Sequence, residues 1–85
     1  QDGNRDPLWS RGLGDVYKRQ INDLEKEDKE LMGEMFILAK ELAKKYKINE
    51  TGYRTVFNTN NDAGQTVFHI HLHLIGGRKL DWPPG

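Results

Sequence analysis

The sequence predicts an α+β domain in which one long helix packs on an antiparallel β-sheet. Three observations lead to this prediction: an apolar stripe with helical spacing at residues 24–46, β-branched and aromatic residues at 53–58, and histidines alternating with aliphatic residues within 65–75. The length of 85 residues allows one small domain at most.

The helix is expected at residues 24–46, where apolar side chains recur every three or four positions. The stripe consists of Leu31, Met35, Leu38, Leu42 and Tyr46. Acidic residues gather at the start of this segment and lysines at its end, which complements the helix macrodipole. Phe36 and Ile37 widen the apolar surface, so the helix either presents a broad core face or also contacts a second subunit.

Two strands are expected to form an antiparallel hairpin. The six polar or small residues 59–64 connect the strand at 53–58 to the strand at 65–75. Gly76 and Gly77 end the second strand, and the prolines of the tail prevent its continuation. Because an isolated two-stranded sheet is marginal in water, we expect further strands of the fold to be missing on the amino-terminal side.

Residues 1–20 show neither helical nor strand periodicity, which predicts a disordered leader. The stretch 10–20 resembles peptides that arise when cloning or adapter DNA is translated. We therefore interpret residues 1–20 as unrelated to the domain at 21–85, with a natural flexible tail as the alternative.

Composition argues against several classes of function. Thirteen basic and thirteen acidic residues leave no net field to attract nucleic acid or an anionic membrane. The sequence has no cysteine, which excludes disulfides, a thiolate nucleophile and a zinc–thiolate site. No apolar run approaches the roughly 20 residues that span a bilayer. We expect a soluble, cytoplasmic protein.

The alternating histidines carry the candidate chemistry. His69, His71 and His73 occupy every second position, so in a strand their imidazoles share one face. A metal site, a polar sheet face and an anion site are all conceivable. Only Asp62 and Asp81 lie nearby as carboxylates, which disfavours a metal site, and a polar face would leave partly buried imidazoles without partners.

The loop before the histidines supports the anion site. Asn58, Gln65 and Thr66 carry amide and hydroxyl donors, and Gly64 lets the backbone approach an oxyanion closely. A neutral imidazole can attack phosphorus while a protonated neighbour stabilises the negative oxygens. This combination suits phosphoryl or nucleotidyl transfer without a metal or another cofactor.

These residues resemble the histidine-triad (HIT) family, and specifically its Hint branch of purine nucleoside phosphoramidases. The resemblance rests on the string GQTVFHIHLHLIGGR at 64–78 and on WPPG at 82–85, and it covers about residues 21–85. It implies a HIT-like fold of which this chain holds the carboxy-terminal part. The strands that supply the nucleobase and ribose pocket in the family are not recognisable in residues 1–20.

The resemblance also implies a role for each matching residue. His71 would attack the α-phosphorus of an AMP or GMP phosphoramidate, while His73 would bind phosphate oxygens and His69 would orient its neighbours. The phosphate pocket would be lined by Asn58, Gly64, Gln65 and Thr66. Trp82 would lie near the active site of the other subunit in a homodimer. The alternative is a truncated, catalytically weak nucleotide-binding or interaction fragment.

Overall fold

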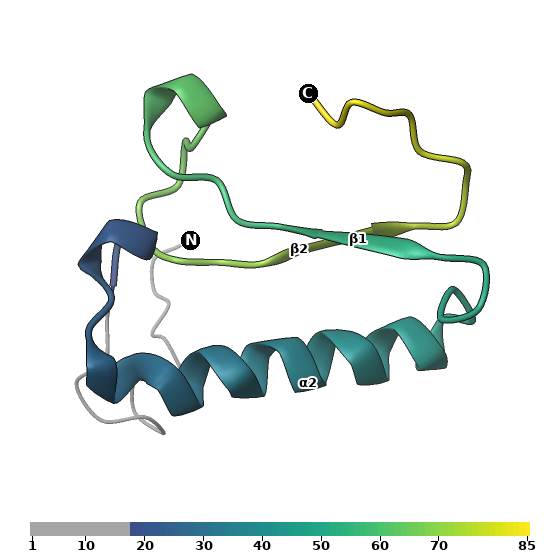
Figure 1. Cartoon of the computed structure of the whole chain (residues 1–85), viewed down its shortest axis with the longest axis horizontal. Coiled ribbons are helices and arrows are strands. Elements are labelled where there is room, and N and C mark those ends of the chain that lie inside the picture. The colour runs from purple at the N-terminus through teal and green to yellow at the C-terminus, as the bar shows by residue number, and fades with distance from the viewer. Residues whose placement is uncertain (1–17) are drawn as a thin grey trace.

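The computed structural model describes residues 18–85 (Figure 1). Its regular elements are the 3₁₀ turns η1 (Ile21–Asp23), η2 (Lys26–Asp28) and η3 (Asn61–Ala63), the helix α2 (Lys29–Lys45) and the strands β1 (Tyr53–Val56) and β2 (His73–Gly76). The helix runs along one face of the two-stranded ribbon, and the η3 loop and the carboxy-terminal tail rise on the other side (Figure 1). The predicted α+β class, with one helix on a small antiparallel sheet, is confirmed.

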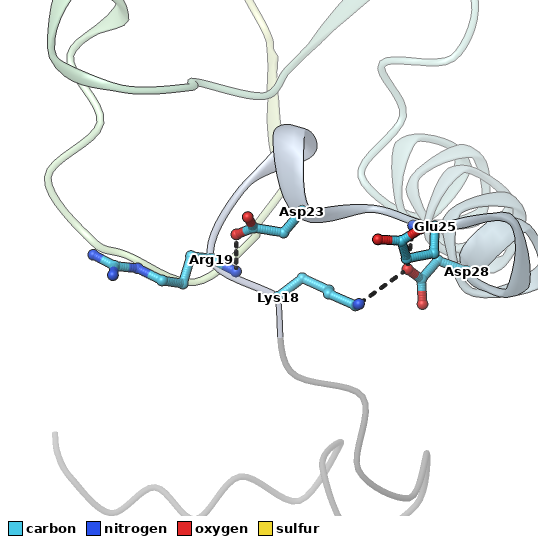
Figure 2. Close-up of polar contacts among 5 residues, drawn as sticks. All are labelled: Lys18, Arg19, Asp23, Glu25 and Asp28. Carbon is cyan, nitrogen blue, oxygen red and sulfur yellow. Dashed lines mark hydrogen bonds and ion pairs between the residues drawn. The ribbon is translucent and has the colours of Figure 1, made fainter.

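Helix α2 begins later than the periodicity predicts, because the residues before it form the 3₁₀ turn η2, which starts with a capping box. The backbone N–H of Glu25 donates to Oδ2 of Asp28 at 2.8 Å, and the Glu25 side chain accepts from the Asp28 backbone. Asp28 is buried, and Nζ of Lys18 lies 3.5 Å from its Oδ2 (Figure 2). The capping box pairs backbone N–H groups at the start of η2, and η2 leads directly into α2, so the chain enters the helix through this turn.

Strands β1 and β2 pair antiparallel, with a register that runs from Tyr53↔Gly76 to Val56↔His73. The predicted hairpin is therefore confirmed, but the prediction of a strand throughout 65–75 was wrong. Residues 65–72 lie outside the ladder, and the N–H of Ile70 donates to the carbonyl of Lys18 at 2.7 Å. A strand needs a paired neighbour over its length, and β1 supplies one only as far as Val56.

The apolar core of residues 18–85 is thin. Its buried members are Ala39, Ala43 and Ile70. A groove of about 770 Å³ lies between α2 and residues 69–74, and Ile37 and Leu38 on its wall remain 54% and 56% exposed. The helix therefore covers the sheet with only part of its apolar surface.

Within residues 18–85, no helix combines the length and the apolar character that crossing a membrane requires.

Candidate active site

A small pocket lies where the loop before the histidines meets the histidine segment. Its volume is about 90 Å³, and it is lined by Asn58, Gly64, Gln65, Thr66, His69, His71 and His73. These seven residues are the ones that the sequence places in the catalytic and phosphate-binding sets, so the fold brings both sets together. Trp82, in contrast, is 80% exposed in the tail and does not line this pocket.

The three imidazoles lie close to one another. The ring centroids of His69 and His71 are 5.8 Å apart, and those of His71 and His73 are 4.6 Å apart. Only His73 belongs to β2, yet all three side chains line the same pocket. The grouping of the rings therefore holds even though the strand is shorter than predicted.

The middle histidine is oriented by its own segment. Nδ1 of His71 lies 3.3 Å from the carbonyl oxygen of His69. When Nδ1 carries the proton, it donates to this carbonyl and leaves the lone pair of Nε2 available. Such an imidazole can act as a nucleophile through Nε2.

The loop side of the pocket offers hydrogen-bond donors to an anion. Gly64 has φ 86°, a left-handed conformation that glycine adopts without a steric penalty. No hydrogen bond within residues 18–85 engages the Thr66 hydroxyl or the side-chain amide of Asn58, and both residues line the pocket. These two groups can therefore donate to phosphate oxygens.

Gln65 differs from the other six lining residues because it is buried, and its side-chain amide bonds to the protein. It is only 6% exposed, its oxygen accepts from the N–H of Asn60 at 2.7 Å, and its nitrogen donates to the carbonyl of Arg19 at 2.7 Å. The sequence did not predict that Asn60 and Arg19 would belong to the site. Asn60 lies in a polar turn without a motif, and Arg19 lies in a segment without periodicity.

The segment before η1 contacts the domain. Besides the Lys18 contacts above, the N–H of Arg19 donates to Oδ2 of Asp23 at 3.1 Å (Figure 2), and Nε2 of Gln20 donates to Oδ1 of Asn60 at 2.7 Å. The leader interpretation otherwise concerns residues 1–17, which lie outside the described part of the chain. Nowhere in residues 18–85 do three His, Cys, Asp or Glu side chains form a group that could hold a metal ion.

The family model for the HIT domain matches residues 16–80. This chain belongs to the HIT domain family. One similar solved structure is that of a HIT family hydrolase from Legionella pneumophila, which shares 49% sequence identity with this chain. The two structures superpose with a TM-score of 0.80 over 84% of this chain and 63% of the Legionella chain. A HIT family hydrolase from Clostridium thermocellum gives 30% identity and a TM-score of 0.74 over 79% of this chain and 58% of that one.

Two curated relatives are HIT-like proteins described as uncharacterised. The one from Synechococcus elongatus is 49% identical over 59 residues, which make up 69% of this chain and 51% of the relative. The one from Buchnera aphidicola is 38% identical over 75 residues, or 88% of this chain and 67% of the relative. The HIT chain thus spans about half to two thirds of the length of these relatives, and residues 18–85 show a partial HIT fold.

Proposed function

We propose that the HIT protein is a nucleotide hydrolase that cleaves the P–N bond of purine nucleoside 5′-phosphoramidates through a nucleotidyl-histidine intermediate on His71. The observation that carries the proposal is the pocket of about 90 Å³, which three histidines line together with the donor residues Asn58 and Thr66. The similarity to proteins described as HIT family hydrolases supports the hydrolytic class.

The proposed chemistry has two displacement steps. Nε2 of His71 attacks the α-phosphorus, the P–N bond breaks, and the amine leaves with a proton from the adjacent imidazolium or from water. Water then attacks the same phosphorus and loses a proton to the adjacent imidazole or to solvent, the bond to Nε2 breaks, and the nucleoside monophosphate is released. Asn58, Thr66 and His73 stabilise the negative oxygens in both steps. The residues present supply a nucleophile and donors without a metal or a cofactor.

We further propose that the active form is a cytoplasmic homodimer, in which Trp82 approaches the site of the other subunit. Two observations support this part of the proposal. Phe36 and Ile37 of α2 are 46% and 54% exposed, which leaves apolar surface for a partner. The guanidinium of Arg54 lies 5.9 Å from the Trp82 ring and donates to the carbonyl of Asp81 at 3.2 Å, which holds the exposed tail beside β1.

The second candidate is a nucleotide-binding or interaction fragment with little or no turnover. The thin core and the open 770 Å³ groove favour it, because a pocket that is weakly supported by packing binds an anion without aligning the reacting atoms. In this case the exposed face of α2 would mediate association.

The deciding experiment is an assay of amine and AMP release from adenosine 5′-phosphoramidate by the unmutated chain and by His71→Ala. We expect His71→Ala to lower kcat/KM by about 1,000-fold or more, since the nucleophile is removed. Asp62→Asn is the matched control, because Asp62 is exposed in η3 and does not line the pocket.

An adenylylated adduct trapped on His71 by rapid quenching would support the covalent route. Retention of activity in His71→Ala would contradict it. AMP binding without turnover by the unmutated chain would favour the binding fragment. Activity that a chelator abolishes would contradict the metal-free chemistry.

A further inference from the structure

The loop beside the pocket contains a strained residue. Asn60 has φ 68° and ψ −177°, a combination that is almost restricted to glycine. A non-glycine residue stays in this region only when its surroundings hold it there. Both sides of Asn60 are held: its N–H donates to Oε1 of Gln65 at 2.7 Å, and its carbonyl accepts from the N–H of Gln65 at 3.1 Å.

The carboxamide of Gln65 is saturated by the protein. Its oxygen accepts from Asn60 and, at 3.3 Å, from Nε2 of Gln20. Its nitrogen donates to the carbonyl of Arg19 at 2.7 Å and to that of Val67 at 3.3 Å. A carboxamide has two donor hydrogens and an oxygen with two lone pairs, so none of its usual capacity is left for a ligand.

The contacts of residues 18–20 join the two sides of the pocket. Gln65 lies between the lining residues Gly64 and Thr66 in the chain. Its bonds to Asn60 and Arg19 therefore fix the positions of Gly64 and Thr66. On the other side, the carbonyl of Lys18 accepts from the N–H of Ile70, which lies between two of the histidines. Residues 18–20 therefore bridge the loop and the histidine segment.

We propose that Gln65 is a positioning residue and not a phosphate ligand: its buried amide clamps the strained Asn60 peptide to residues 19–20 and thereby places Gly64 and Thr66 against the anion. We call the four hydrogen bonds of the Gln65 carboxamide, to Arg19, Gln20, Asn60 and Val67, the Gln65 clamp. The proposal rests on the proposed function for the identity of the anion, whereas the clamp itself can be measured in the absence of any ligand.

The first test measures amide hydrogen exchange and AMP affinity in Gln65→Met, which keeps the length of the side chain but removes its polar atoms. We expect the Asn60 amide to exchange at least about 10-fold faster and AMP to bind about 10-fold more weakly. Unchanged exchange at Asn60 would overturn the clamp, whatever happens to AMP binding.

The second test asks whether glycine can replace the clamp. In Gln65→Met/Asn60→Gly, glycine adopts the required backbone without help, so we expect AMP affinity to return to within about 3-fold of the unmutated chain. A direct ligand role predicts no rescue, because glycine restores no donor to the phosphate. Thr66→Val is the control, since its loss of affinity should not be rescued by Asn60→Gly.

A milder variant covers the case in which Gln65→Met does not fold. Gln20 contacts Asn60 and Gln65 but does not line the pocket, so Gln20→Ala should weaken AMP binding by about 3-fold through the clamp. Unaltered affinity in Gln20→Ala would contradict the positioning role. If the unmutated chain binds no AMP, the proposed function fails, and the exchange rate of Asn60 in Gln20→Ala still decides whether the clamp exists.

Discussion

The polar pocket and the apolar groove share a wall, yet they are built in different ways. His69 and His71 line both cavities, whereas Ile70, Leu72 and Leu74 line only the groove. The pocket measures about 90 Å³, and hydrogen bonds around Gln65 shape it. The groove measures about 770 Å³, and its walls include the half-exposed Ile37 and Leu38. Hydrogen bonds thus shape the polar side within residues 18–85, but these residues leave much of the apolar side uncovered.

This contrast separates two kinds of dependence. The pocket depends on a few directional bonds, so a single lost donor changes ligand affinity and leaves most of the packing intact. The core beside the groove depends on a small apolar area, so a single lost contact there is a large fraction of the stability. The predictions below test this separation, beginning with the largest expected effect.

The largest effect on stability is expected when a charged side chain is placed on the buried face of α2. Ala43 is fully buried, at 0% exposure, so Ala43→Asp should lower the free energy of unfolding by about 4 kcal/mol, because a carboxylate there has no partner. Urea denaturation followed by circular dichroism measures this change.

The matched control for Ala43→Asp is Leu38→Asp, which introduces the same charge into the same helix. Leu38 is 56% exposed on the groove wall, so its substitution should cost less than about 1 kcal/mol. Equal losses in the two variants would show that the groove is filled in solution and would break the comparison between the two cavities.

The next effect concerns the residue that separates the two cavities. Ile70 is 8% exposed and lies between two histidines of the pocket, with its own side chain on the groove. Ile70→Ala should cost about 2 to 3 kcal/mol of unfolding free energy, since it leaves a cavity. Its backbone bond to Lys18 remains, so AMP affinity measured at low temperature should change by less than about 3-fold. A parallel loss of affinity would show that the two sides of the segment are coupled.

Sequence reasoning recovered what is encoded locally. The alternation of His69, His71 and His73 and the donors of the preceding loop identified all seven lining residues of the pocket. It overextended the second strand, because a ladder requires a non-local partner and Val56 is the last residue of β1 that supplies one. It also placed the helix start too early, because the bond between Glu25 and Asp28 stabilises a turn that periodicity does not register.

The sequence did not predict the Gln65 clamp, and the reason is related. Gln65 was predicted to line the phosphate pocket, and it does, but no pattern indicated that its amide would be used by Arg19, Asn60 and Val67. A contact between residues 46 positions apart leaves no periodicity in a single sequence. Carrying a whole motif over from a family assigns side chains to a pocket without separating ligands from residues that hold the pocket open.

The smallest effect on stability is expected at the pocket, where it should accompany a clear effect on binding. Thr66 is exposed, and no hydrogen bond within residues 18–85 engages its hydroxyl, so Thr66→Val should change the free energy of unfolding by less than about 0.5 kcal/mol. AMP affinity should fall by about 10-fold, because one donor to the phosphate oxygens is lost. Thr66→Ser keeps the hydroxyl and should bind within about 3-fold of the unmutated chain. If calorimetry shows Thr66→Val and Thr66→Ser binding AMP equally well, the hydroxyl does not contact the anion, and the donors of the pocket reduce to Asn58 and the histidines.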